Sequence, residues 1–303
     1  MGKTAFIFPG QGSQYVGMGK EYFENDAHAR ALFEQADSLL GIPLTRICFE
    51  GPEEELRQTK NTQPAIFLHS MVVASRLTDL SADMVAGHSL GEYSALVAAG
   101  AISFEDGLRI VRLRGELMQQ AGEMSKGTMA AIVGLEAAAV EELCREAASA
   151  GVVQPANFNS PGQIVISGSV EGVRKGMEIA KQRGAKLVKE LVVSGAFHSP
   201  LMEHAKDGLR RKLDETPIQN ATMPLYANVN AEPVTKASEI REFLYQQLTS
   251  PVRWEETIKN MVRDGCTRFQ EVGPGRVLQG LVKRTVPDVL VSGFDKLTDL
   301  QPV

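Results

Sequence analysis

Residues 82–100 have the sequence ADMVAGHSLGEYSALVAAG, which changes from a strand pattern to a helix pattern across one sharp turn. The first part, 82–86, is a short apolar run that predicts a buried strand. The last part, 92–99, is rich in alanine and predicts a helix that ends at Gly100. A strand followed directly by a helix is the repeating unit of a parallel sheet, so this stretch predicts an α/β fold.

The chain on both sides of this stretch continues the alternation of strands and helices. Residues 4–8 form an apolar run that ends at Pro9-Gly10 and predicts a buried strand, and 63–80 predicts a helix. We therefore expect 1–123 and 195–303 to form one large domain with a parallel sheet. In its second part, helices are expected over 200–213, 237–248 and 254–264, and strands over 224–229 and 268–272.

A different pattern of short units lies between these two parts. It predicts strand, helix, strand, strand, helix and strand in that order, and the order βαββαβ is typical of ferredoxin-like domains. We therefore expect a small ferredoxin-like domain, 124–194, inserted into the large one. Its six predicted segments are 128–133, 136–150, 153–159, 163–168, 170–183 and 186–193.

Composition and charge exclude several classes of protein. The 303 residues are 43% hydrophobic and 23% charged, which is typical of a soluble globular protein and excludes a disordered chain or a coiled coil. Since 32 Lys and Arg stand against 37 Asp and Glu, the net charge is −5. Binding to nucleic acid phosphates needs a basic surface, so we expect no nucleic-acid partner.

The location of the protein is predicted by three further features. The most apolar stretch, 84–102, contains His88, Glu92 and Tyr93 and is not expected to cross a membrane. The N-terminus does not have the pattern of a signal peptide. The three cysteines lie far apart in the sequence, which argues for a reducing compartment and against disulfides or a structural zinc site. We therefore expect a cytoplasmic protein without a bound metal.

The turn Gly87-His88-Ser89-Leu90-Gly91 fits the pattern G-x-S-x-G, in which glycines on both sides let the serine hydroxyl project from a sharp turn. The expected strand before it and helix after it are the context in which this serine acts as a nucleophile. The N–H groups at the start of that helix would stabilise an oxyanion. The alternative is a glycine-flanked turn whose serine only caps the helix.

A serine nucleophile needs a general base, and the chain has five histidines. His198 lies in a loop between a predicted strand and a predicted helix, where catalytic groups concentrate, although it could also be an imidazole satisfied within that turn. His88 adjoins the serine and is expected to support it, whereas His28, His69 and His204 are expected on the surface or in packing. No acidic residue lies near His198 in sequence, so we expect a backbone carbonyl to orient it.

Two further segments are candidates for binding. In the loop Pro9-Gly10-Gln11-Gly12, the glycines let the backbone approach a substrate and offer an N–H to an oxyanion, although a plain connecting loop is equally compatible with them. Tyr15 occupies the third glycine position of a dinucleotide loop, which excludes that motif. The predicted helix 108–118 carries three arginines. Most arginines on such a helix are solvated, but one turned inward would bind a carboxylate. They are Arg109, Arg112 and Arg114.

Taken together, the motifs resemble those of the malonyl-CoA:acyl carrier protein transacylases of bacterial fatty-acid synthesis. The resemblance covers essentially the whole chain, and several ordered motifs are far more specific than any one of them. It implies an α/β-hydrolase-like large domain interrupted by a ferredoxin-like small one. The matching segments are FPGQGSQ (8–14), QPA (63–65), GHSLGEY (87–93), RLRG (112–115), NFNSPGQ (157–163), GAFHS (195–199) and EVGPG (271–275).

The resemblance also implies a role for each site residue. Ser89 would carry the malonyl group as an ester, and His198 would act first as base and then as acid. Gln11 and the backbone N–H of Leu90 would form the oxyanion hole. Arg114 would pair with the free carboxylate of malonate.

Three more residues have supporting roles by the same resemblance. The backbone carbonyl of Gln247 would orient the histidine. Changing the side chain of Gln247 should therefore lower activity less than changing His198. His88 and Asn157 would be supporting residues of the pocket.

The implied reaction needs no bound cofactor, since malonyl-CoA and phosphopantetheinylated acyl carrier protein are its substrates. The resemblance also implies a monomer. Acyl carrier proteins are acidic, so a basic face on the small domain is a candidate docking surface, although solvated helix and strand edges would look the same. Its residues are Arg174, Lys175, Lys181, Arg183, Lys186 and Lys189, with Lys283 and Arg284 nearby.

Other functions remain open on the sequence alone. The chain could be a free-standing acyltransferase of a polyketide system, an acyl-thioester hydrolase with the same serine and histidine, or a non-catalytic protein that binds carrier proteins. Arg114 favours the transferase over the hydrolase, because a thioesterase needs no group that binds a carboxylate. The presence of Ser89, His198 and Arg114 together disfavours a non-catalytic protein.

Overall fold

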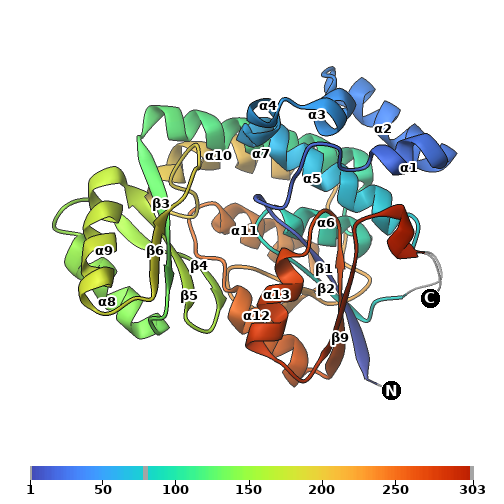
Figure 1. Cartoon of the computed structure of the whole chain (residues 1–303). Helices are drawn as coiled ribbons and strands as arrows, with labels where there is room; N and C mark the ends of the chain where they lie inside the picture. Colours follow the sequence, from blue (N-terminus) through green and yellow to red (C-terminus); the bar gives the residue numbers. More distant parts are fainter. Residues whose placement is uncertain (1, 78–80, 301–303) are drawn as a thin grey trace.

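The computed structural model describes residues 2–77 and 81–300 and places them in two β-sheets with helices packed around them (Figure 1). The larger sheet has the strand order β10-β9-β1-β2-β7-β8, in which neighbours are parallel except for the final pair, β7 and β8. Its strands are β1 (Lys3–Phe8), β2 (Met84–Gly87), β7 (Leu225–Tyr226), β8 (Pro233–Val234), β9 (Cys266–Val272) and β10 (Leu290–Phe294).

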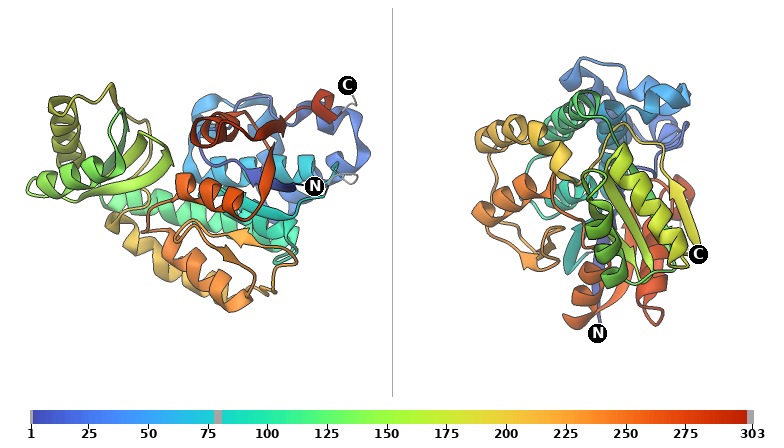
Figure 2. Two further views of the ribbon diagram at one scale, coloured as in Figure 1. Left: turned by 90° about the horizontal axis from the view of Figure 1, so that it is seen from below. Right: turned by 90° about the vertical axis from the view of Figure 1, so that its left-hand side faces the viewer.

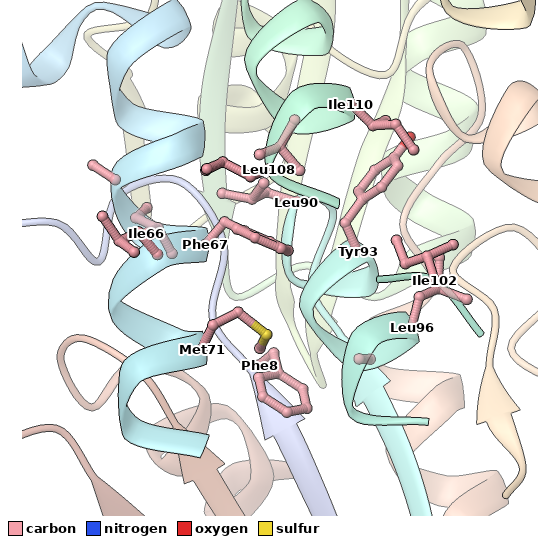
Figure 3. Close-up of a cluster of buried hydrophobic side chains, with 14 of the residues drawn as sticks. Phe8, Ile66, Phe67, Met71, Leu90, Tyr93, Leu96, Ile102, Leu108 and Ile110 are labelled. Carbon is pink, nitrogen blue, oxygen red and sulfur yellow. The ribbon is translucent and has the colours of Figure 1, made fainter. Parts of the chain in front are cut away.

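The central strand β1 is apolar on both faces because helices cover both sides of the sheet. Phe6 and Phe8 point into a core shared with several helices, and Figure 3 shows part of this core. Ala5 and Ile7 alternate with them and point into a second core with Trp254 on the opposite side. The helices of the first core include α5 (Thr59–Ala74), α6 (Gly91–Ala98) and α7 (Phe104–Met124), and those of the second are α12 (Trp254–Arg263) and α13 (Val277–Thr285).

The smaller sheet is antiparallel, with the strand order β4-β5-β3-β6, and it stands to one side of the larger sheet (Figure 2). Two helices pack on it around a separate apolar core. Its elements follow the predicted order of strand, helix, strand, strand, helix and strand. They are β3 (Gly127–Val133), α8 (Ala137–Ala147), β4 (Val153–Ser160), β5 (Gln163–Ser169), α9 (Val170–Gln182) and β6 (Leu187–Glu190).

The remaining helices belong to the part of the chain that carries the larger sheet. Helices α1 to α4 lie over α5 on the side away from the sheet (Figure 1). Helices α10 and α11 follow the small sheet in sequence. The bounds of all these helices are α1 (Lys20–Asn25), α2 (Ala27–Leu40), α3 (Leu44–Glu50), α4 (Glu53–Arg57), α10 (Glu203–Glu215) and α11 (Ala237–Gln247), with one-turn helices at Pro200–Met202 and Leu297–Leu300.

Several predicted elements have other bounds in the structure, and three of these differences concern the surroundings of the site or the described range. The helix expected over 63–80 runs from Thr59 to Ala74, and positions 78–80 of that prediction lie outside the described residues. The strand expected over 186–193 ends at Glu190, because the next residues leave the sheet to line a pocket. The strand expected over 224–229 ends at Tyr226, and a turn follows it that brings Asn228 beneath Ser89.

No helix among the described residues is long and apolar enough to span a lipid bilayer.

Candidate active site

Ser89 lies on a sharp turn between β2 and α6, and its backbone has the left-handed φ of 51°. The turn is possible only with glycine on both sides. A Cβ atom on Gly87 would lie 1.9 Å from the backbone of Gly91, and one on Gly91 would lie 2.0 Å from the carbonyl oxygen of Phe8. The G-x-S-x-G pattern therefore has a steric cause, and it presents the serine hydroxyl at the carboxyl end of the parallel strands.

His198 lies within hydrogen-bond distance of this hydroxyl, with Nε2 2.8 Å from Ser89 Oγ. Its Nδ1 faces two backbone carbonyl oxygens, those of Gln247 at 2.9 Å and Ser250 at 3.2 Å. Carbonyl oxygens only accept hydrogen bonds, so Nδ1 carries the proton and the lone pair of Nε2 faces the serine. The geometry therefore suits a general base whose orientation comes from the backbone, and Ser250 is a partner that the sequence did not indicate.

The electrostatic surroundings keep this imidazole neutral. Burial, followed by the positive charge of Arg114, lowers the pKa of His198 to about 3. A neutral imidazole can accept the proton of a serine hydroxyl, whereas an imidazolium cannot. The side chain is 3% exposed, so bulk water does not compete for Nε2.

Arg114 is the arginine of α7 that turns inward, and it is 1% exposed. Its Nη1 donates to Gln63 Oε1 at 2.8 Å. Its Nη2 donates to Gln247 Oε1 at 2.8 Å and to Ser89 Oγ at 3.1 Å, while Nε is buried without a partner among the described residues. A guanidinium thus stands directly beside the candidate nucleophile, where it can bind an anionic group on an acyl chain.

The other two arginines of α7 serve different contacts. Arg109 pairs with Asp106 on the surface, 3.8 Å away. Arg112 donates to the carbonyl of Lys60 and to Asn61, which joins α7 to α5. The helical pattern alone did not distinguish these three arginines.

The side chain of Gln247 takes part in the site as well as its backbone. Its Oε1 faces Arg114, and its Nε2 donates to the carbonyl of Ser89 at 3.0 Å and to Glu92 Oε2 at 2.6 Å. The sequence assigned a role only to the backbone carbonyl. The side chain links the nucleophile, the guanidinium and a buried carboxylate.

His88 and Asn157 both line the pocket, but they have different surroundings. His88 Nε2 lies 2.8 Å from Asn159 Oδ1, and its ring packs edge-on against Trp254. Desolvation lowers the pKa of His88, so its ring stays neutral. Asn157 is buried, and its backbone forms a bridge to Val252. His88 points away from the serine hydroxyl, as expected of neighbours on a sharp turn.

Gln11 and Leu90 lie beside Ser89 in the same pocket. The Gln11 side chain donates weakly to Thr59 Oγ1 at 3.4 Å. Among the loop and cap hydrogen bonds of the described residues, none uses the backbone N–H of Gln11 or Leu90. Both N–H groups are therefore free to donate to a ligand oxygen.

Three residues complete the network without having been predicted as site residues. Asn228 accepts from the N–H of Ser89 and donates to the carbonyl of Gly87, both at 2.7 Å, which holds the turn from below. Gln63 holds Arg114, and Glu92 holds Gln247. Gln63 and Glu92 stand inside motifs that the sequence had singled out, whereas Asn228 follows a strand with no motif around it.

The pocket lies between the two sheets and has a polar floor and apolar walls. The floor carries Ser89, His198 and Arg114. The walls come from both parts of the chain, so a ligand would contact both. The wall residues are Met118, Met129, Val165, Leu191, Val193, Phe197, Val277, Leu278 and Leu281.

Comparison with known proteins identifies the family. The sequence model of the acyl transferase domain family matches residues 5–296. The chain is 48% identical over 287 residues to the malonyl CoA-acyl carrier protein transacylase of Bacillus subtilis (strain 168), covering 94% of this chain and 90% of the relative. The chain belongs to the malonyl CoA-acyl carrier protein transacylase family. It is accordingly an acyltransferase.

Other members of this transacylase family agree in sequence and in fold. The protein of the same name from Staphylococcus aureus (strain COL) is 40% identical over 302 residues, covering 99% of this chain and 98% of the relative. The crystal structure of an acyl carrier protein S-malonyltransferase from Vibrio cholerae superposes with a TM-score of 0.95 at 41% identity, covering 98% of each chain.

One further structure shows a member of the family with a partner. It is a malonyl-transacylase in complex with a holo type II PKS acyl-carrier protein, and it superposes with a TM-score of 0.94 at 39% identity, covering 98% of this chain and 97% of the other.

In the part of the present chain that the structure describes, no group of three or more His, Cys, Asp or Glu side chains is placed to hold a metal ion.

Proposed function

We propose that this chain transfers the malonyl group of malonyl-CoA to the phosphopantetheine thiol of acyl carrier protein, through an ester on Ser89. The observation that carries the proposal is the distance of 3.1 Å between Arg114 Nη2 and Ser89 Oγ. The carboxylate of a malonyl ester stands one methylene from the ester carbonyl, so its partner must lie next to the nucleophile. A guanidinium in that position favours an acyl group with a short carboxylate arm.

In the first half-reaction, His198 Nε2 takes the proton of Ser89 Oγ while that oxygen bonds to the thioester carbonyl carbon. The negative charge on the carbonyl oxygen is stabilised by the free N–H groups of Gln11 and Leu90. The C–S bond then breaks, and the departing sulfur of coenzyme A takes the proton from His198. Malonyl remains as an ester on the serine.

The second half-reaction runs the same steps in reverse with another thiol. His198 takes the proton of the phosphopantetheine thiol, whose sulfur bonds to the ester carbonyl. The C–O bond breaks, and Ser89 recovers its proton from the imidazolium. Because both halves use one oxyanion hole and one base, the two thiols occupy the pocket in turn.

Arg114 would select the acyl group. A malonyl carboxylate forms a charge-assisted pair with the guanidinium, whereas an acetyl group leaves that pair unmade. A hydrogen bond to a charged group is worth about 1.5 to 3 kcal/mol, which corresponds to a preference of roughly ten- to a hundredfold. The apolar walls would keep water from the ester while the thiol arm enters.

We also propose the two-domain organisation expected from the sequence. The antiparallel order β4-β5-β3-β6 with two packed helices supports a ferredoxin-like domain, 124–194. The parallel strands with a nucleophile turn after β2 support an α/β-hydrolase-like domain made of 1–123 and 195–303. The chain would act as a monomer in the cytoplasm.

Charge complementarity supports docking of an acidic carrier protein on the basic face of the small domain. Some basic residues of the candidate face already pair with acids. Arg174 pairs with Glu190, Lys175 with Glu178, and Arg183 with two glutamates. The ion pairs of the described residues leave Lys181, Lys186, Lys189 and Lys283 to contact a carrier, and Arg284 contacts Gln163 beside the pocket.

Intact-mass measurement after mixing with malonyl-CoA tests the proposal. We expect one malonyl adduct, absent in Ser89→Ala and retained in Ser13→Ala, a matched serine that also lines the pocket. Transfer of that adduct to a holo carrier protein should then follow. Release of free malonate without an adduct would favour the hydrolase instead. A panel of fatty-acid and polyketide carrier proteins would distinguish the two transferase functions.

A further inference from the structure

Glu92 is a buried carboxylate at the floor of the site that the reaction steps above do not use. It lies in the first turn of α6, three residues after the nucleophile, and is 1% exposed. Its Oε2 accepts from Gln247 Nε2 at 2.6 Å and from the backbone N–H of Asn228 at 3.3 Å. An ionised carboxylate in such a place is stable only with a compensating charge nearby.

The nearby charge is Arg114, which is itself buried without a directly bound carboxylate in the described part of the chain. Its guanidinium donates to the amide oxygens of Gln63 and Gln247 and to the hydroxyl of Ser89, all of which are neutral. Among the ion pairs of the described residues, none joins Arg114 to a carboxylate. Burial lowers the pKa of Arg114, and the interactions with Tyr93 and with the carboxyl group of Glu92 oppose that effect.

The amide of Gln247 connects these two charges. Its Oε1 accepts from Arg114 Nη2, and its Nε2 donates to Glu92 on the other side. Since Nε2 also donates to the carbonyl of Ser89, the amide is fixed with its oxygen toward the guanidinium. The reverse orientation would place an NH₂ group against a cation.

We propose that Glu92 is a positioning residue that acts as the counter-charge of Arg114. One amide separates the two charged groups, so the guanidinium beside Ser89, here called the fork, stays open to a ligand. This inference rests on the proposed function for the identity of the ligand that enters the fork. A direct bidentate pair between Glu92 and Arg114 would block that ligand. With the carboxylate one side chain away, the guanidinium is compensated in the free enzyme and still binds a substrate carboxylate.

Glu92 supplies a counter-charge only where its carboxyl group is ionised, and its surroundings set that pH range. Burial raises the pKa of Glu92 to about 7, and the contacts with Gln247 and Asn228 and the charge of Arg114 hold it from rising further. Glu271 is equally buried, and burial also raises its pKa to about 7. Its carboxylate accepts from the backbone N–H groups of Leu278 and Gln279 at the start of α13, so it serves as a matched control.

The test compares Glu92→Gln with Glu271→Gln in the free enzyme and in the malonylated enzyme. We expect Glu92→Gln to lower Tm by on the order of 5 °C in the free enzyme, because the guanidinium loses its counter-charge. In the malonylated enzyme the substrate carboxylate replaces that charge, so at least half of the loss should be recovered. Glu271→Gln should lower Tm equally in both forms. Equal losses for Glu92→Gln in both forms would overturn the proposal.

A double variant gives a second test that does not depend on the substrate. Glu92→Gln combined with Arg114→Met removes both charges, so we expect a higher Tm than in Glu92→Gln alone. If Glu92→Gln does not fold, folding of the double variant supports the proposal and its failure to fold overturns it. A wild-type enzyme without a malonyl adduct would refute the proposed function and leave this second comparison valid.

Discussion

The floor and the walls of the pocket are built in different ways. On the floor, Ser89, His198, Arg114 and Gln247 are each fixed by two or more hydrogen bonds from different elements. The walls are apolar side chains, such as Leu281, that are held by packing. The floor therefore determines the chemistry through the positions of a few atoms. The walls determine which ligands enter the pocket, because their shape selects the ligand and their apolar surface excludes water.

The largest effect is expected for the base on the floor. His198→Ala should slow formation of the malonyl adduct by about 10³ to 10⁴-fold, because no other described group lies where Nε2 accepts the serine proton. Rapid-quench mass spectrometry measures this rate. His204→Ala, an exposed histidine on α10, is the control and should react at the wild-type rate. A loss of less than tenfold in His198→Ala would exclude it as the base.

The next effect concerns the group that binds the carboxylate. Arg114→Met should lower kcat/KM for malonyl-CoA by about a hundredfold and should reduce the preference over acetyl-CoA, because the charged pair is removed from both ground and transition state. Arg109→Met, on the exposed face of the same helix, should change neither value. An unchanged ratio of malonyl to acetyl transfer in Arg114→Met would refute the role of this arginine.

A smaller and different effect is expected for the walls. Leu281→Ala opens space in α13 beside the site, so water should reach the ester more easily. We expect hydrolysis of the malonyl adduct to rise on the order of threefold, with adduct formation changed by less than that. The released malonate and the transferred malonyl group can be counted in one assay. A fall in adduct formation as large as that of Arg114→Met would mean that floor and walls do not differ.

The smallest effect is expected from pH. Because burial and Arg114 lower the pKa of His198 to about 3, the imidazole stays neutral from pH 8 down to about pH 5. Single-turnover acylation by the Glu92→Gln variant, which lacks the carboxylate whose pKa is about 7, should therefore show no inflection near pH 6.5, the ordinary pKa of histidine. The unfolded chain binds this proton below pH 6.5 and the folded chain does not, so the contribution of His198 to stability is lost as pH falls toward 3. An inflection near pH 6.5 would show that the imidazole is exposed to solvent in the working enzyme.

Local sequence signals predicted the sharp turn around Ser89 well. The glycines on both sides of Ser89 have a steric reason that is contained in five consecutive residues, and the strand and helix around them have clear patterns. The alternation in residues 128–193 likewise predicted the order of the elements in the small sheet. Such features depend on neighbours in sequence, so the sequence alone contains them.

The network of the floor could not be predicted in the same way. Gln247 Nε2 and Glu92 Oε2 are 155 positions apart, and Asn228 and Ser89 are 139 apart. Nothing in the residues around Asn228 distinguishes it, since its role depends on where the end of β7 lies relative to β2. The choice of Arg114 among three arginines depended in the same way on which face of α7 lies against Ser89 and Gln247.

The left-handed backbone of the reacting pair has a consequence for laboratory evolution. Among the described residues other than glycine, only Ser89, His198 and Ala231 have a positive φ. Each such residue costs about 1 kcal/mol or more, and glycine would relieve that strain. A selection for heat resistance alone would therefore favour glycine at 89, where only a hydroxymethyl group is lost, and it would enrich robust but inactive proteins. Any selection for a more thermostable variant of this enzyme therefore has to measure turnover in the same round.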